Sequence, residues 1–323
     1  MAMLFEKQIV AAYKKNLLVR HDDVGLVHYF CAADFDGLVA EPFSFKGSRG
    51  QALCGYVYYY GSISTERLVI FDHGMGAGHR PYMKEIEALA RRGFTVLSYD
   101  HTGCMMSEGE NIGGFAQSLC DLDFCIRAVK ADPRFASLSL SVVGHSWGAF
   151  STLNISALHT DITHIVAMSG FVSVRSMLKQ FFKGPLGLYI PALYRLECEN
   201  QPDYAHFDAI ESLKASQARA LIIHSTDDKT VSFRQHFAKM EKALAARPDT
   251  VFLKVEGKGH NPNFTEEAVK IKNAFFASLT KKVKRGYFTD EAKKAEFKAS
   301  YDFWRMSEQD EEMWDKIADF LGK

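Results

Sequence analysis

Short runs of β-favouring residues alternate with amphipathic helical patterns from about residue 40 onward. The strand-like runs lie at 52–60, 68–72, 95–99, 138–143, 165–168, 220–224 and 251–255. The helical patterns lie near 80–92, 114–131, 147–157, 233–246 and 264–280. Strands joined through helices pair in parallel, because each helix returns the chain to the same end of the sheet. The sequence therefore predicts an α/β fold, with a mostly parallel sheet of about eight strands and helices on both faces.

The alternation breaks once, over the roughly forty residues between Gly170 and Leu213, which contain no clear parallel strand. This stretch is rich in aromatic and aliphatic residues. Apolar clefts are the usual sites for small ligands, so we predict that 171–213 form a helical lid. Phe181, Phe182 and Tyr189 are then expected to wall the substrate cleft. An ordinary helical core is the alternative.

The other segments divide around this insertion. We expect the α/β core to comprise 40–170 and 214–281, with an N-terminal extension at 1–39 and a C-terminal helical extension at 282–323. In the last helical pattern Met313, Trp314 and Ile317 recur at helical spacing, after a Ser307-to-Asp310 spacing that resembles a capping box. This helix is expected to dock on the core, and a partner-binding helix is the alternative.

Composition narrows the classes of partner. The chain has 39 Lys and Arg against 39 Asp and Glu, so no net charge draws it to nucleic acid or to an anionic membrane. No apolar stretch approaches the roughly 18 residues of a membrane span, and the N-terminal residues do not resemble a signal peptide. Six scattered cysteines suggest reduced thiols and a cytoplasmic location. Metal and phosphate-binding motifs are missing, so we expect no cofactor and no metal.

The clearest chemical motif is Gly144-His145-Ser146-Trp147-Gly148, which directly follows the strand at 138–143 and precedes a helical pattern. A side chain presented on so tight a turn requires small residues two positions away on either side, and glycine meets this requirement. Ser146 is therefore a candidate nucleophile. The backbone N–H of Trp147, at the start of the helix, is a candidate donor to a developing oxyanion.

A second glycine-rich turn, from Asp72-His73-Gly74-Met75 to Gly78, follows the strand at 68–72. We expect the N–H of Met75 to be the second oxyanion donor and His73 to brace the turn. The spacing of Gly74 and Gly76 also fits the start of a dinucleotide-binding fingerprint, with Asp100 after a later strand. However, His79 occupies the third glycine position, and such a site would leave the serine turn unexplained.

With these motifs the chain resembles the α/β-hydrolase superfamily, and within it the esterase, lipase and serine aminopeptidase-like members that share a His-Gly-x-Gly turn. The resemblance covers about 50–280. Residues 100–107 are similar to the family's Asp-x-Arg-Gly-x-Gly-x-Ser loop but depart from it at His101-Thr102 and at Met105. The resemblance implies the α/β-hydrolase fold and a triad in the order serine, acid, histidine.

Two loop segments that follow Ser146 in the sequence match the acid and histidine positions of that pattern. Residues 225–231 are similar to the family's Gly-x-x-Asp-x-x-Val turn, which makes Asp228 the acid, or its neighbour Asp227 if the turn is shifted by one. After the final strand, the glycine-rich run 256–262 contains His260, where the family places its base. A serine hydroxyl needs such a base at neutral pH, and the base needs a carboxylate to orient it.

The predicted function is that of a serine hydrolase, which cleaves a carboxylic ester of a small, largely apolar acyl substrate through an acyl-enzyme. The apolar lid and the lack of an acidic cluster within it favour an ester. An aminopeptidase-like peptidase, a thioesterase or an acyltransferase would use the same triad. A non-catalytic ligand-binding member of the fold is the alternative of another class. The oligomeric state is left open.

Overall fold

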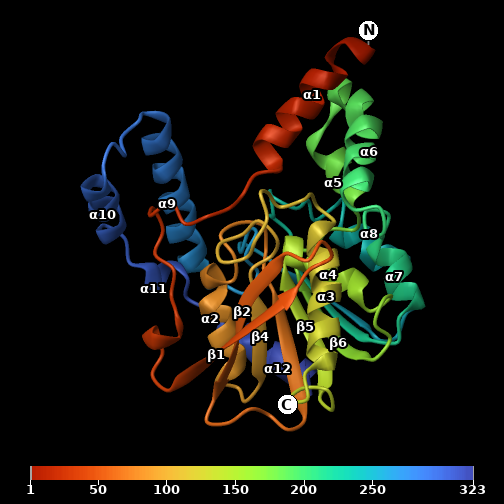
Figure 1. Cartoon of the computed structure of the whole chain (residues 1–323), viewed down its shortest axis with the longest axis vertical. Coiled ribbons are helices and arrows are strands. Elements are labelled where there is room, and N and C mark those ends of the chain that lie inside the picture. The colour runs from red at the N-terminus through yellow and green to blue at the C-terminus, as the bar shows by residue number, and fades with distance from the viewer. Residues whose placement is uncertain (1, 323) are drawn as a thin grey trace.

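An eight-stranded sheet forms the centre of the computed structural model, which describes residues 2–322 (Figure 1). Its strands are β1 (Leu38–Lys46), β2 (Ala52–Tyr60), β3 (Arg67–Asp72), β4 (Thr95–Tyr99), β5 (Ser139–His145), β6 (Ile162–Met168), β7 (Arg219–Ser225) and β8 (Thr250–Val255). They lie in the order β1-β2-β4-β3-β5-β6-β7-β8. Only β2 runs antiparallel to its neighbours, β1 and β4. The predicted mostly parallel α/β sheet is confirmed.

The edge strand β1 was not predicted from the sequence. It pairs along its whole length with β2, and Pro42 lies in its middle. Proline within a run argues against a central strand, but an edge strand tolerates it because one side needs no partner. The sheet therefore begins at Leu38, before the boundary expected at residue 40.

Helices connect the parallel strands and cover the sheet. The α-helices are α1 (Ala2–Leu17), α2 (Met83–Ala90), α3 (Gln117–Ala131), α4 (Trp147–Ile155), α5 (Val174–Phe181), α6 (Ile190–Asn200), α7 (Ala209–Ala215), α8 (Phe237–Ala243), α9 (Glu266–Lys284), α10 (Glu291–Ala299), α11 (Phe303–Met306) and α12 (Glu311–Phe320). Short 3-10 helices occur at η1 (Ala32–Asp34), η2 (Arg80–Tyr82) and η3 (Gly184–Tyr189). Among residues 2–322, no helix combines the length and apolarity needed to cross a membrane.

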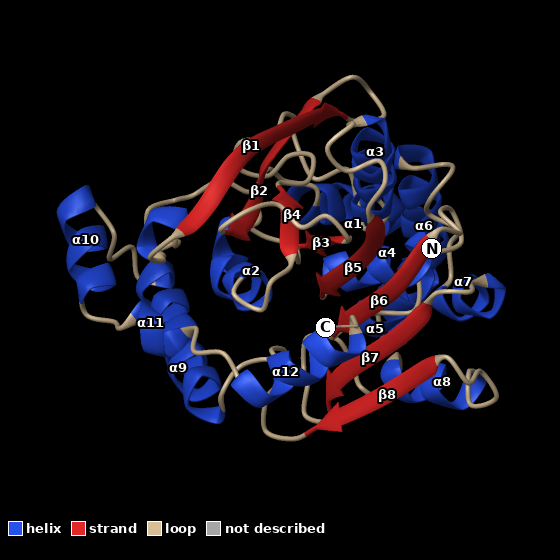
Figure 2. Ribbon diagram, turned by 90° about the horizontal axis from the view of Figure 1, so that it is seen from below, coloured by secondary structure: helices blue, strands red, loops and turns tan. Residues whose placement is uncertain are grey.

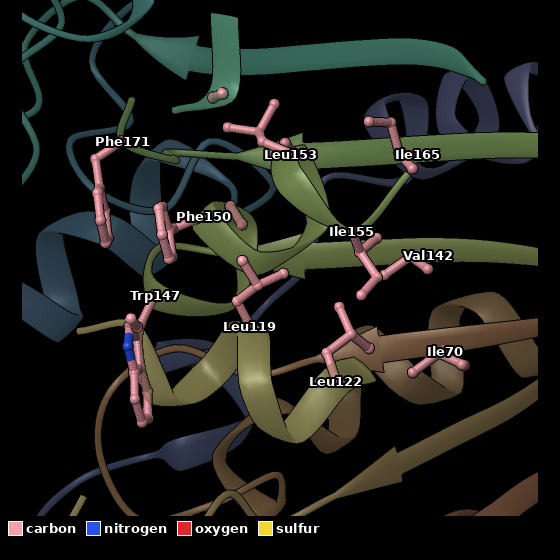
Figure 3. Close-up of a cluster of buried hydrophobic side chains, with 14 of the residues drawn as sticks. Ile70, Leu119, Leu122, Val142, Trp147, Phe150, Leu153, Ile155, Ile165 and Phe171 are labelled. Atoms are coloured by element: carbon pink, nitrogen blue, oxygen red, sulfur yellow. The ribbon is translucent and has the colours of Figure 1, made fainter. Parts of the chain in front are cut away.

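The sheet separates two hydrophobic cores. Alternate residues of β3 point to opposite faces, so Leu68 and Ile70 join one core while Val69 and Phe71 join the other. Helices α3, α4 and α8 contribute to the first core, and α2, α9 and α12 to the second (Figure 2). Figure 3 shows part of the first core, in which the rings of Phe150 and Phe171 stack 4.7 Å apart. Ser146, the residue before α4, is therefore held between packed elements.

The segment between β6 and β7 contains α5, η3, α6 and α7. A bridge between Ser173 and Asp208 joins the start of α5 to the start of α7, so it closes the part that contains α5, η3 and α6. Helix α1 lies beside η3 and α6 (Figure 1). The hydroxyl of Tyr13 on α1 donates to the buried carboxyl of Glu197 on α6, which also accepts from the N–H of Phe115 at 2.8 Å. The N-terminal segment is thus part of the structure around this insertion.

The C-terminal segment packs against the second core. Trp314 of α12 is fully buried and donates to Gln309 at 2.9 Å. The helix begins after Asp310, whose carboxylate accepts from the N–H of Met313, so the expected start at Ser307 was wrong. Ser307 instead caps the end of α11. A short loop from Ser307 to Asp310 therefore separates α11 from α12.

Replacing Trp314 with alanine tests the docking of α12. The change removes a fully buried indole, so it should lower the free energy of unfolding by about 3–5 kcal/mol. Trp304→Ala is the matched control, because this indole is 47% exposed and should cost less than half as much. Denaturant unfolding measures both, and equal losses would contradict the docking.

Glu197 makes a pH-dependent contribution to stability. Burial raises its pKa from 4.5 to about 7, against the opposing hydrogen bond from Tyr13. The folded protein therefore holds a proton that the unfolded chain releases, and the free energy of unfolding falls as pH rises from about 4.5 to about 7. We expect Glu197→Gln to reduce this fall in denaturant titrations across that range. Glu199 is exposed, so Glu199→Gln is the control and should keep the wild-type dependence of the free energy of unfolding on pH. The same dependence in Glu197→Gln would refute the assignment.

Candidate active site

Ser146 lies in a strained turn between β5 and α4. Its backbone has φ 57° and ψ −111°, in the positive-φ region that side chains other than glycine rarely adopt. A Cβ on Gly144 would lie 2.2 Å from Thr152 Oγ1, and a Cβ on Gly148 only 2.1 Å from the carbonyl oxygen of Asp72. Neither position accommodates a side chain. The turn predicted from the glycine spacing is therefore present, with the serine at its apex.

Ser146, His260 and Asp228 form one hydrogen-bonded chain. His260 Nε2 lies 2.9 Å from Ser146 Oγ, and His260 Nδ1 lies 2.8 Å from Asp228 Oδ2. A carboxylate at Nδ1 fixes the proton on that nitrogen, so Nε2 is free to accept one from the hydroxyl. The side chains come from the ends of β5, β7 and β8, at one edge of the sheet.

Asp228 is held as a carboxylate. Its Oδ1 accepts from the N–H groups of Thr230 and Val231 at 2.8 and 3.0 Å, and its Oδ2 lies 3.2 Å from His224 Nε2. Burial raises the pKa of Asp228, but the hydrogen bonds from His224 and His260 outweigh this effect and hold the pKa below its usual value. The carboxylate therefore stays charged at neutral pH and faces Nδ1 of His260.

The neighbouring acid, Asp227, has a different set of contacts. Its Oδ1 accepts from the hydroxyl of Ser225 and from the N–H of Gly259 at 3.2 Å. It thus ties the β7 turn to the loop that carries His260. Of the two acids left open by the sequence, Asp228 is the one whose side chain reaches the imidazole.

His145, beside the nucleophile in sequence, bridges two parts of the site. Its Nε2 lies 2.7 Å from the carbonyl oxygen of His260, and its Nδ1 lies 3.0 Å from the hydroxyl of Tyr82. Burial, with His260 nearby, lowers the pKa of His145 well below its usual value. The neutral ring therefore donates from Nε2 and accepts at Nδ1. This geometry fixes the His260 backbone relative to the serine turn.

The glycine-rich turn after β3 packs against Tyr82 and His145. A Cβ on Gly74 would lie 2.4 Å from the Tyr82 hydroxyl and 3.3 Å from His145 Nδ1. His73 lies 2.7 Å from the carbonyl oxygen of Gly74 through Nδ1, and its Nε2 accepts from the N–H of His101 at 3.0 Å. Met75 lines the cavity in front of Ser146. His73 thus braces the turn that carries the candidate oxyanion donor.

Asp100, the acid of the dinucleotide alternative, is already engaged. It is buried, and its Oδ1 accepts from the N–H of His79 at 2.8 Å and lies 2.7 Å from His79 Nδ1. Its Oδ2 accepts from the N–H of Met106 at 3.1 Å. Both oxygens stabilise the loops, and neither is free to bind a ribose hydroxyl.

A cavity of about 380 Å³ lies in front of Ser146 and His260. Phe181 lines it, together with Trp147 and with Leu17 from α1. The other two aromatic residues expected there lie elsewhere: Phe182 packs 6.1 Å from the ring of Tyr13, and Tyr189 ends η3. Helix α5 carries Phe181 toward the cavity, and its end at that residue turns Phe182 away. Within the part of the chain that the structure describes, no group of histidine, cysteine, aspartate and glutamate could hold a metal ion.

Comparisons with known proteins agree with this architecture. The sequence profile of the serine aminopeptidase, S33, family matches residues 64–206, a range that includes the Ser146 turn and ends before Asp228 and His260. The α/β hydrolase domain-containing protein 17C of Xenopus tropicalis is 24% identical over 226 residues, 68% of this chain. The aligned residues span 64% of the length of that relative.

Solved structures show the same fold at low identity. A Pyrococcus furiosus esterase has a TM-score of 0.59 and 18% identity, over 83% of this chain and 99% of its own. An α/β hydrolase from Penicillium has a TM-score of 0.52 and 16% identity, over 69% of this chain and 91% of its own. At these identities the likeness shows that the chain has the fold of these solved structures.

Tyr82, His224 and Leu17 are among the site residues that were not predicted from the sequence. His224 is the last residue but one of β7 and lies four residues before Asp228, and this position near the end of a strand was a local signal. Tyr82 and Leu17 gave none, because they reach the site only through the packing of η2 and α1.

The two adjacent acids provide an internal test of the hydrogen-bonded chain. Asp228→Asn removes the charge that holds His260 Nδ1–H, so it should lower kcat for any serine-dependent reaction by about 10³–10⁴-fold. Asp227→Asn perturbs only the loop contacts and should cost less than about tenfold. Steady-state kinetics on both variants distinguishes them. The opposite ranking would transfer the role to Asp227.

Proposed function

We propose that this protein hydrolyses a carboxylic ester of a small, largely apolar acyl substrate through an acyl-enzyme on Ser146. The observation that carries the proposal is the unbroken chain Ser146–His260–Asp228, with contacts of 2.9 and 2.8 Å, at the base of a cavity. A binding protein has no need of this arrangement. The cavity volume suits a small molecule.

In the first half of the reaction, Ser146 Oγ attacks the ester carbonyl while His260 Nε2 takes the hydroxyl proton. Asp228 stabilises the resulting imidazolium without taking its proton. The carbonyl oxygen becomes an oxyanion, for which the N–H groups of Met75 and Trp147 are the proposed donors. Trp147 begins α4, so its N–H has no partner within the helix.

The second half of the reaction releases both products. His260 gives its proton to the leaving alkoxide, and the alcohol departs as the acyl group stays on Ser146. Water then attacks the acyl carbon while His260 removes its proton, and collapse of the second tetrahedral intermediate returns that proton to Ser146 Oγ. The carboxylic acid leaves and the free enzyme is restored.

The composition of the cavity favours an ester over a peptide with a free amino terminus. Among the described residues that line the Ser146 cavity, none is an aspartate or a glutamate, so an ammonium group has no counter-charge there. Phe115, Phe171, Met177 and Phe181 provide apolar walls. The Pyrococcus furiosus relative is itself described as an esterase.

A substrate panel tests the proposal. Kinetics on para-nitrophenyl esters, acyl thioesters and short peptides should give the highest kcat/KM for an ester. Ser146→Ala should reduce kcat by about 10⁶-fold, because the nucleophile is lost. Ser300→Ala, on the distant helix cap of α10, should retain wild-type rates.

Other outcomes would redirect the assignment. Peptides cleaved far faster than any ester would support an aminopeptidase, and a thioester preference would support a thioesterase with the same residues. Saturable ligand binding without turnover of any compound, in folded protein, would refute the enzymatic proposal and support a binding protein.

A further inference from the structure

A second chamber adjoins the Ser146 cavity. This second chamber has a volume of about 330 Å³, and its apolar lining includes Phe30, Phe303 and Met306. Met75, Tyr82, Lys272 and Phe276 line both cavities. The wall between them is thus made by the candidate oxyanion turn, by the residue that holds His145 and by one face of α9. A substrate longer than the first cavity would extend past these residues.

Lys272 is the charged residue common to both cavities. It is partly buried on α9, and its Nζ lies 4.5 Å from the centre of the Phe264 ring. None of the ion pairs formed within residues 2–322 includes it. Burial lowers the pKa of Lys272, and the nearby carboxyl of Glu85 opposes this. A partly buried ammonium that forms no ion pair is incompletely compensated, so an anion that reaches it gains a strong interaction.

The other lysine and arginine side chains that line the two cavities already have partners within the protein. Lys258 lies 3.1 Å from Asp310 Oδ2 and donates to the carbonyl oxygen of Phe264 at 2.7 Å. Arg80 donates to the carbonyl oxygens of Tyr29 and Phe30. These cations are oriented by the protein itself, which leaves Lys272 to meet a ligand.

Glu85 is the carboxyl group of the second chamber. It is 2% exposed, accepts from Asn263 at 3.2 Å through Oε1, and its Oε2 has no hydrogen-bond partner among the described residues. Burial raises the pKa of Glu85 to about 7. At neutral pH this group is therefore only partly ionised, and it does not fully neutralise Lys272.

We propose that Lys272 is a specificity residue that binds an anionic group at one end of the substrate, so that the preferred esters carry a carboxylate. The inference rests on the proposed ester hydrolysis and specifies its substrate class. The ester carbonyl would lie at Ser146, an apolar portion would cross the wall at Met75 and Phe276, and the carboxylate would meet Nζ of Lys272.

Matched pairs of esters test this assignment on either side of the scissile bond. For the acyl side, the pair is para-nitrophenyl octanoate and the para-nitrophenyl monoester of suberic acid. For the alcohol side, the pair is phenyl butyrate and its para-carboxyphenyl analogue. The quantity compared is the ratio of kcat/KM for the anionic ester to that for its neutral partner. Wild type should give a ratio above one in at least one pair.

Variants of α9 then locate the origin of the preference. Lys272→Met should lower that ratio by about 10–100-fold, because a charge-assisted hydrogen bond is lost, and Lys272→Arg should restore part of it. Lys270→Met, an exposed lysine on the same helix, is the control and should keep the wild-type ratio. Thermal unfolding of each variant checks that it folds.

The outcomes separate this inference from the function on which it rests. If neutral esters are hydrolysed but wild type shows no preference in either pair, the role of Lys272 is overturned and ester hydrolysis stands. An anionic preference that survives in folded Lys272→Met also overturns it. If the wild-type protein hydrolyses none of the four esters, both proposals are overturned.

Discussion

The close contact between the Ser146 turn and the end of β3 sets the position of everything else at the site. Gly148 lies so near the Asp72 carbonyl that no side chain fits, and Gly144 is equally confined by Thr152. The strained φ of Ser146 persists because β5 and α4 are both fixed by packing in the first core (Figure 3). A serine held this rigidly loses little freedom when it reacts, which favours precise orientation toward a base.

The partners of Ser146 are held by groups that connect neighbouring loops. His145 and Tyr82 join the serine turn, the His260 loop and η2, while Asp227 and Asp228 hold the same loop from β7. The loops follow β3, β5, β7 and β8, which run parallel in the sheet. The carboxyl ends of these strands therefore lie along the same side of the sheet. The proposed chemistry therefore depends on contacts between loops, whereas the sheet provides only their common origin.

Much of this arrangement follows from local sequence. Strand-to-helix alternation predicted the parallel sheet, and the glycines around Ser146 predicted the turn, because both are consequences of steric rules over a few residues. Contacts between residues far apart in sequence were harder to predict. The edge strand β1 was not predicted, and Pro42 in its middle argues against a central strand. Phe182 and Tyr189 lie outside the cavity, because the end of α5 and the packing of α1 determine which aromatic side chains face it. Such choices depend on tertiary contacts that no periodicity reports.

The proposed chemistry requires that Ser146 is an activated nucleophile. Labelling the folded protein with a fluorophosphonate probe, followed by peptide mass spectrometry, tests this claim without knowledge of the substrate. We expect a single label on Ser146 that is lost in Ser146→Ala and forms much more slowly in His260→Ala. A label on another residue, or no label on a protein shown to be folded, would contradict it.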